Sequence, residues 1–125
     1  MRPTILDAAP ILGCTDLSAS IAFYARLGFE NVIQFTRYAI LRRDGAEIHL
    51  SLGDGPNPYP KAHCFLRVAS TEAFYRDLKE RGIRVEPPIE RECYVKEVCV
   101  WDLDGNELKF AEAVEDRMLQ FEARR

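Results

Sequence analysis

The sequence lacks a basic excess, a long apolar run and a secretion signal, and each absence excludes a class of protein. Its 125 residues carry 17 Lys and Arg against 20 Asp and Glu, a formal net charge of −3, whereas a surface that binds nucleic-acid phosphates needs a basic excess. No apolar run approaches the roughly 18 residues of a membrane span. The first residues contain Asp7 and lack a signal-peptide profile. We therefore expect a cytoplasmic protein that binds neither nucleic acid nor a membrane.

Cysteine and histidine are scarce, which excludes several kinds of site. The four cysteines form no C-x-x-C pair, so the sequence gives no support to a zinc ribbon or a thioredoxin-type site. We interpret them as reduced thiols, with Cys14 and Cys64 as small core residues. The sequence also has no G-x-S-x-G elbow and no G-x-x-x-x-G-K phosphate loop. We therefore assign no catalytic residue.

What the sequence does contain is an internal repeat. Ala22-Phe23-Tyr24 recurs as Ala73-Phe74-Tyr75, 51 positions later, and Asp44-Gly45 recurs with its following strand as Asp104-Gly105, 60 positions later. Each match is weak alone. Because the matches come in the same order and cover most of the chain, they indicate two homologous halves.

Both halves are typical of a β-α-β-β-β order, since apolar runs of strand length flank one amphipathic helix. Gly28 and Gly82 occupy the position after each helix, where a left-handed backbone is favourable for glycine. The fold class is therefore α+β, with two βαβββ modules forming a curved mixed sheet with a concave cleft. The expected strands are 8–14, 30–35, 37–43 and 46–52, then 63–68, 84–86, 95–101 and 106–112, and the expected helices are 17–27 and 71–81.

We expect a single domain over residues 1–125. Module 1 covers about 8–53, and module 2 covers about 62–112. The linker between them, about 54–61, is rich in proline and glycine. The tail, 113–125, could form a short helix that presents Val114, Met118, Leu119 and Phe121.

Strand alternation predicts which side chains share a face. Ile48 and Leu50 alternate with Glu47 and His49, so the apolar set should face the helices and the polar set should line the cleft. Polar and aromatic groups on a concave face are typical of a ligand site. The candidate ligand-binding residues are Glu47, His49, His63, Glu97, Trp101, Lys109, Tyr38 and Tyr94.

Two segments carry a family resemblance. Thr15-Asp-Leu-Ser-Ala-Ser-Ile-Ala-Phe-Tyr-Ala-Arg-Leu-Gly-Phe29 resembles the opening of the vicinal oxygen chelate superfamily, which includes glyoxalases, extradiol dioxygenases and bleomycin-resistance proteins. Asp102-Leu-Asp-Gly-Asn106 resembles its closing D-P-D-G-N turn, with Leu103 in place of proline. The resemblance spans about residues 9–111.

The resemblance implies four metal-ligand positions, two in each half. They fall on Ala9, His49, His63 and Lys109. Alanine offers no donor atom, and a protonated lysine repels a divalent cation at close range. A catalytic zinc site usually needs three protein ligands, so we expect no metal and no other cofactor.

The chain resembles most the metal-free, bleomycin-resistance-like members. This implies a homodimer that sequesters a cationic or aromatic small molecule, such as a bleomycin-like ligand, without chemistry. Glu47 and Glu97 suit a cation, whereas Lys109 does not. One alternative is a metal-dependent glyoxalase- or dioxygenase-type enzyme that uses His49, His63 and a third ligand such as Glu97 or Glu107. Another is a binding module for a small aromatic or acidic metabolite, with Lys109 as the anion contact.

Structural explanations stand beside these roles. The two histidines could be relic residues that only form hydrogen bonds in the cleft. Lys109 could be part of a structural ion pair with a nearby glutamate, and Trp101 could anchor a core or a subunit interface.

Overall fold

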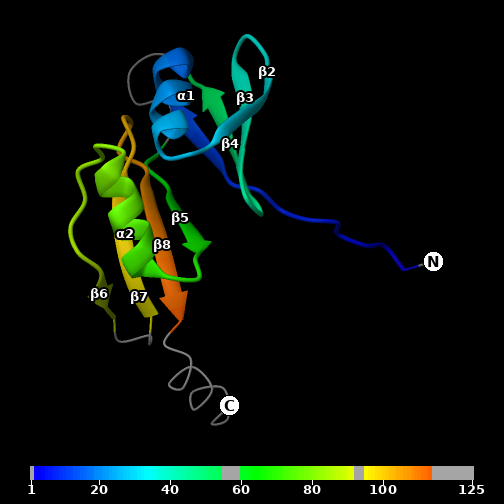
Figure 1. Ribbon diagram of the computed structural model, residues 1–125. Coiled ribbons are helices and arrows are strands. Elements are labelled where there is room, and N and C mark those ends of the chain that lie inside the picture. Colours follow the sequence, from blue (N-terminus) through cyan, green and yellow to red (C-terminus); the bar gives the residue numbers. More distant parts are fainter. Residues whose placement is uncertain (1, 55–59, 92–94, 114–125) are drawn as a thin grey trace. The chain divides into compact units, whose positions relative to one another are not determined.

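The computed structural model describes residues 2–54, 60–91 and 95–113 (Figure 1). Both halves have the β-α-β-β-β order that the repeat predicts. The first half consists of β1 (Ile11–Cys14), α1 (Leu17–Arg26), β2 (Glu30–Gln34), β3 (Tyr38–Arg43) and β4 (Ala46–Leu52). The second half consists of β5 (His63–Arg67), α2 (Thr71–Glu80), β6 (Ile89–Glu90), β7 (Val95–Trp101) and β8 (Glu107–Ala113).

The chain divides into two compact units, unit 1 (Met1–Ala62) and unit 2 (His63–Arg125). Each unit has an open four-stranded sheet, in the order β1-β4-β3-β2 or β5-β8-β7-β6. The sheets are mixed, because β1 pairs with β4 and β5 pairs with β8 in parallel while the other pairs are antiparallel. The α+β class and the two modules are therefore confirmed. A single domain over both units stays a prediction.

Strand register shows which positions of the two units correspond. Leu12 pairs with Leu50 in unit 1, and Leu66 pairs with Phe110 in unit 2. The first strands are thus offset by 54 positions and the last strands by 60. The helix caps Asp16 and Ser70 share the offset of 54. The Ala-Phe-Tyr match at 51 positions is therefore three residues out of structural register.

Each helix begins at a side-chain cap and covers one face of its own sheet (Figure 1). The Asp16 carboxylate accepts from the N–H of Ala19 at 3.0 Å, and the Ser70 hydroxyl accepts from the N–H of Ala73 at 3.1 Å. Such caps pair N–H groups that the first helical turn leaves without partners. They fix where the helices start relative to the strands.

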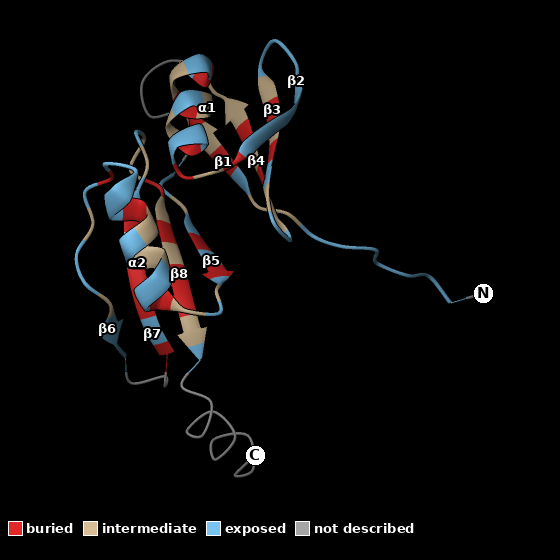
Figure 2. Ribbon diagram, in the orientation of Figure 1, coloured by how far each residue is buried: buried red, intermediate tan, exposed pale blue. Residues whose placement is uncertain are grey.

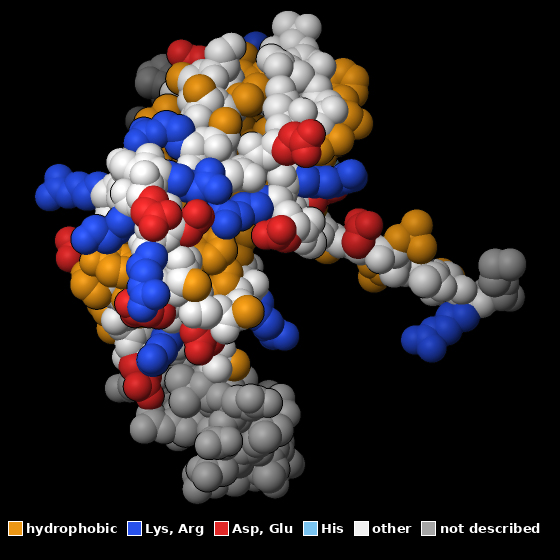
Figure 3. Space-filling model, viewed as in Figure 1, with side chains coloured by type: hydrophobic (Ala, Val, Ile, Leu, Met, Phe, Trp, Pro, Cys, Tyr) orange, Lys and Arg blue, Asp and Glu red, His pale blue; other side chains and the backbone are white. Residues whose placement is uncertain are grey.

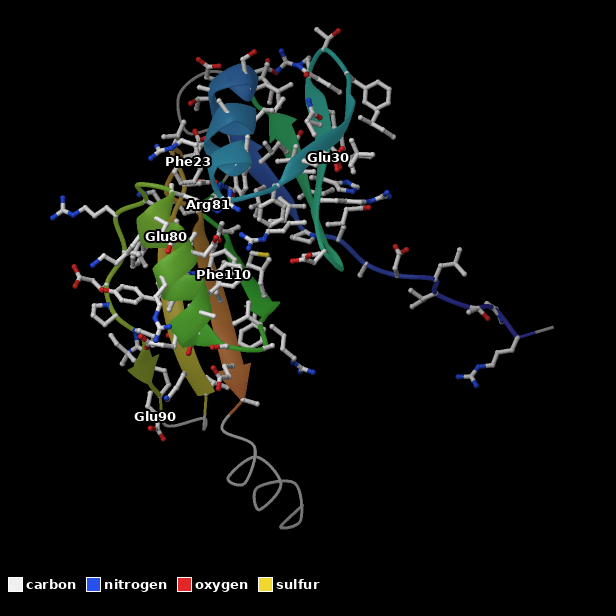
Figure 4. The ribbon with its side chains drawn as sticks, in the orientation of Figure 1. Phe23, Glu30, Glu80, Arg81, Glu90 and Phe110 are labelled. Atoms are coloured by element: carbon white, nitrogen blue, oxygen red, sulfur yellow. The ribbon has the colours of Figure 1, made fainter. Side chains whose placement is uncertain are left out.

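The core of each unit lies between its helix and its sheet. In unit 1, Tyr24 of α1 is fully buried with Ile48 and Leu50 of β4. In unit 2, Phe74 of α2 stacks on Phe110 of β8 with ring centroids 4.6 Å apart, and Figure 4 shows Phe110 against α2. Figure 2 shows the buried residues on the sheet-facing sides of both helices, while the outward sides are exposed. Cys14 and Cys64 are buried, as predicted.

Two details of the elements differ from the prediction. The strand expected at 84–86 does not form. Its place in the sheet is taken by the two-residue β6 (Ile89–Glu90), because Pro87 and Pro88 lack the N–H that strand pairing requires. Both helices end one residue earlier than expected, at Arg26 and Glu80, and the buried face of α1 runs through Leu17, Ser20 and Tyr24. The predicted tail helix (114–125) and most of the linker, residues 55–59, lie outside the described residues.

The turns between the last two strands differ between the units. Asp44 and Gly45 form a two-residue loop, with Arg43 paired to Ala46 and Asp44 at φ 50°, a geometry that Asp-Gly favours. In unit 2 the connection is the longer 102–106. There the Asp102 carboxylate accepts from the N–H groups of Asp104 and Asn106, each at 2.9 Å. The carboxylate thus holds the loop closed.

β2 is the outer strand of its sheet, and all five of its residues are exposed. Its pairing with β3 shifts register between Asn31 and Ile33, which marks a β-bulge. Within the ranges that the structure describes, no helix has the length and hydropathy of a membrane crossing.

Candidate functional site

Every described candidate residue lies on the sheet face opposite the helices, which we call the open face of its unit. Along β4, Ile48 and Leu50 are fully buried while Glu47 and His49 are partly exposed. Along β8, Leu108 and Phe110 are buried while Lys109 is partly exposed. The predicted strand register is therefore confirmed. Glu47, His49 and Tyr38 belong to unit 1, whereas His63, Glu97, Trp101 and Lys109 belong to unit 2.

On the open face of unit 1, four side chains form a continuous chain of contacts. The hydroxyl of Tyr38 lies 2.6 Å from Nδ1 of His49. Nε2 of His49 lies 2.8 Å from Oε2 of Glu47. Oε1 of Glu47 accepts from Nε of Arg42 at 2.7 Å. Direct pairing of Arg42 with Glu47 across the β3–β4 hairpin places the two side chains together.

The chemistry of the acceptors assigns the protons in this chain. An ionised carboxylate only accepts, so His49 donates from Nε2 to Glu47. When the imidazole carries a single proton, on Nε2, its Nδ1 is an acceptor and the Tyr38 hydroxyl donates to it. Hydrogen bonds from His49 and then from Arg42 lower the pKa of Glu47. Burial, with the charge of Glu47 second, raises the pKa of Tyr38. The network thus favours an ionised Glu47 and a protonated phenol.

On the open face of unit 2, Glu107 is the shared partner of two candidate residues. Nδ1 of His63 lies 2.9 Å from Oε1 of Glu107, and Nζ of Lys109 lies 3.6 Å from the same oxygen. Glu107 pairs with His63 across the β5–β8 ladder, so the imidazole and the carboxylate are direct neighbours. The ion pair expected of Lys109 is therefore present, and its partner is Glu107.

Glu97 is the most buried carboxylate on this face, with 7% of its surface exposed. Its Oε1 accepts from Nε of Arg91 at 2.7 Å and lies 3.9 Å from Sγ of Cys99. The same hydrogen bond to Glu97 raises the pKa of Arg91. Burial, and then the charge of Glu97, raises the pKa of Cys99. The thiol is therefore held protonated and is a poor nucleophile.

Trp101 is 58% exposed and so is not a core residue. It ends β7 opposite Glu107, on the same face as Lys109. Tyr94, the remaining aromatic candidate, lies outside the described residues. Unit 1 also exposes the apolar side chains of Val32 and Ile33 in β2 and of Phe35 just after it. Figure 3 shows hydrophobic atoms on the surface of this unit.

The donor atoms at the four family ligand positions do not fit a metal ion. Ala9 has no side-chain donor, and the ammonium group of Lys109 is ion-paired with Glu107. Both ring nitrogens of His49 already form hydrogen bonds, to Tyr38 and Glu47. Within residues 2–54, 60–91 and 95–113, no three His, Cys, Asp or Glu side chains come together as a metal site would require. We therefore derive no metal chemistry.

Sequence reasoning missed four residues of these faces: Arg42, Arg91, Phe65 and Arg67. A signal existed for Arg42, since a two-residue Asp-Gly turn places it opposite Glu47. Phe65 and Arg67 alternate with the buried Cys64 and Leu66, so strand parity also indicated them. No sequence signal indicated Arg91, which follows the unexpected β6.

Comparison with known protein families identifies the superfamily to which this fold belongs. The model of the Glyoxalase/Bleomycin resistance protein/Dioxygenase superfamily matches residues 6–110. The chain belongs to this superfamily. The match confirms the resemblance carried by the helix-opening and D-G-N segments, and it covers both modules.

Relatives within the superfamily include bleomycin-resistance proteins. A bleomycin resistance protein of Klebsiella pneumoniae is 33% identical over 79 residues, which is 62% of this chain. The matched segment spans 63% of that protein's length, under two thirds.

Solved structures give a fuller match. A bleomycin-binding protein complexed with bleomycin superimposes with a TM-score of 0.77 at 29% identity, over 85% of this chain and 97% of the other. A bleomycin resistance determinant encoded on the transposon Tn5 gives 0.78 at 27% identity, over 86% and 98%.

Proposed function

We propose that this superfamily member binds a bleomycin-like ligand stoichiometrically and does not alter it chemically. The observation that carries the proposal is the match to the bleomycin-binding protein complexed with bleomycin, which covers nearly all of that chain at a TM-score of 0.77. The match to the Klebsiella pneumoniae protein supports it independently. The donor set at the family's metal positions gives no route to metal-assisted catalysis.

The residues of the open faces suit an aromatic ligand better than a simple cation. Glu47 and Glu97 were expected to attract positive charge, yet each is paired with an arginine at 2.7 Å. Such pairing reduces the field that a cation would feel. Trp101 and Tyr38 remain as aromatic contacts, and the exposed indole of Trp101 can stack on a planar group. We infer that aromatic contact supplies most of the affinity.

Calorimetric titration of the purified protein with metal-free bleomycin, in EDTA, tests the proposal. We expect saturable binding and recovery of unmodified bleomycin by mass spectrometry. Trp101→Ala should weaken binding by about tenfold, or ~1.4 kcal/mol, the upper range for one aromatic contact. Leu103→Ala is the matched control, because Leu103 is 60% exposed and lies two positions away. Absence of binding heat at high protein concentration, or a chemically changed drug, would exclude this function.

We also propose a homodimer in which each subunit contributes to binding, and action in the cytoplasm. The dimer is supported by the exposed apolar residues near the N-terminus: Ile5 is 88% exposed and Leu6 is 91% exposed. A two-fold contact buries the same patch on both subunits.

A further inference from the structure

The proposed function uses Trp101 of the open face of unit 2, and the other side chains of this face form a regular arrangement around it. Where β5, β8 and β7 all lie side by side, they place nine side chains on it in three rows, because residues paired across a sheet point to the same side. The rows are Trp101, Glu107 and His63, then Cys99, Lys109 and Phe65, then Glu97, Ala111 and Arg67. Lys109 therefore stands at the centre of these three rows.

This face has more cationic side chains than carboxylates to pair with them. Arg91 is paired with Glu97, and Glu107 serves both Lys109 and His63 through a single oxygen. The side chain of Arg67 is exposed, and no ion pair joins it to another residue of the described part of the chain. Three cationic side chains thus face two carboxylates. The surplus positive charge lies at Arg67 and at Lys109, whose ion pair is long at 3.6 Å.

Register places these two cationic groups within reach of one anion. Arg67 pairs with Ala111, two positions along β8 from Lys109, so the two are diagonal neighbours. Diagonal positions on adjacent strands are about 8 Å apart. Both side chains are long, and the methyl group of Ala111 between them occupies little space. An anionic group above Ala111 could contact both cations.

Aromatic side chains lie on both sides of Lys109, on the two strands that pair with β8. Trp101 and Phe65 are each 58% exposed, which is unusual for large apolar groups. Phe65 is the direct neighbour of Lys109, and Trp101 is its diagonal neighbour. Cys99, on the third side, is small and has a raised pKa, so it adds no negative charge. The face thus combines aromatic surface with a cationic pair.

We propose that this face binds a small aromatic carboxylate. Its ring lies against Trp101 and Phe65, and its carboxylate contacts Lys109 and Arg67. The ligand class follows from charge complementarity with the surplus at Arg67 and from the exposed rings. Both proposals use Trp101, but this one does not rest on the proposed function, because its ligand class is argued from Lys109 and Arg67. All of its residues belong to unit 2.

A matched series of probes tests the charge requirement on the unmodified protein. Titration calorimetry at low salt compares 2-naphthoate with the neutral 2-naphthamide, the cationic 2-naphthylmethylammonium and the ring-free anion acetate. We expect binding of 2-naphthoate at least about tenfold tighter than binding of the other three, and weakening as salt is added. Equal affinity for the acid and the amide overturns the proposal.

Variants then locate the site. Lys109→Gln and Arg67→Gln should each weaken 2-naphthoate binding by about fivefold to tenfold, the loss expected for one charge-assisted contact. Lys96→Gln is the control for Lys109, because Lys96 lies on β7 at positions that alternate to the other face. Arg76→Gln on the exposed side of α2 is the control for Arg67. Losses no larger than those of the controls overturn the site.

Bleomycin titrations of the same proteins separate the two proposals. Binding of 2-naphthoate without binding of bleomycin supports this site and excludes the proposed function. Binding of bleomycin without 2-naphthoate does the reverse. Circular dichroism shows whether each variant folds. The probe series tests the proposal on the unmodified protein, so its result does not depend on the folding of any variant.

Discussion

Glu47 joins two other side chains on the open face of unit 1. It accepts from His49 with one oxygen and from Arg42 with the other, and those bonds hold its pKa below the ordinary 4.5. A carboxyl whose pKa is lowered by folding stabilises the protein where it is ionised. The contribution is complete above the ordinary pKa and is lost as pH falls through the lowered value.

Replacement of Glu47 by Gln should therefore destabilise the protein in a pH-dependent way. Urea unfolding of the unmodified protein and Glu47→Gln should show a lower midpoint for the variant at pH 7. The gap should narrow as the pH falls below about 4.5, where the unfolded carboxyl is protonated. Glu80→Gln, at the exposed end of α2, serves as the control. A gap of constant size from pH 7 to acid would show that the network does not act through the charge of Glu47.

At the scale of residues, the sequence predicted which sheet face a side chain lies on better than it predicted the residue with which that side chain forms a hydrogen bond or ion pair. Period-two alternation placed His49 and Lys109 away from the core, because burial of their apolar neighbours leaves no other register. The partners depend on neighbouring strands. Glu97 was assigned to the cleft, yet its partner Arg91 follows a strand that the sequence placed five residues too early. The exposure of Trp101 likewise depends on whether other parts of the fold pack over the end of β7, which the sequence of the strand does not reveal.

At the scale of elements, α2 begins at a contact with a residue far along the chain, which no local sequence pattern indicates. The N–H and hydroxyl groups of Thr71 both donate to Oε1 of Glu112, at 2.7 and 3.2 Å. Thr71 is buried, so these donors have little access to water. A carboxylate at the start of a helix also interacts favourably with the helix dipole. Glu112 thus fastens α2 to the end of β8.

Glu112→Gln should lower the free energy of unfolding by about 1–2 kcal/mol, because a charged acceptor of two buried donors is replaced by a neutral one. Urea unfolding at pH 7 measures the change. Glu72→Gln is the control, because Glu72 is also in the first turn of α2 but is exposed and forms a surface ion pair with Arg76. It should change stability by less than about 0.5 kcal/mol. Equal losses in both variants would contradict a special role for Glu112.

Most helices and strands could be predicted from the sequence. The exception is β6, whose position depends on where the chain pairs with β7. Caps, glycines after helices and Asp-Gly turns are local signals, and they located both helices and both terminal hairpins. The only local signal for β6 is the pair of prolines before it. They exclude a regular strand across 84–88 but do not indicate where a paired strand begins. The longer 102–106 loop depends on Asp102 accepting two backbone N–H groups, which the Asp-Gly motif alone does not reveal.

For the whole molecule, the proposed homodimer predicts a defined mass in solution. Sedimentation at micromolar concentration should give a species of twice 14.3 kDa if the chain is a homodimer. Leu6→Asp should shift the protein toward the monomer, because a charge in a two-fold contact is buried twice. Leu103→Asp, which exposes a charge at a comparably exposed position in unit 2, should leave the mass unchanged. A species near 14.3 kDa at every concentration would exclude the dimer.

The bulge in β2 has a consequence for solubility. An outer strand carries unpaired main-chain groups on one side, and β2 combines such an edge with the apolar Val32 and Ile33. A regular strand of this composition would be a template for fibrous aggregation. The register shift between Asn31 and Ile33 interrupts the spacing that an incoming strand would need. Unit 2 achieves the same protection differently, since β6 spans only two residues and follows two prolines. The two modules thus protect the edges at β2 and β6 against polymerisation by different means.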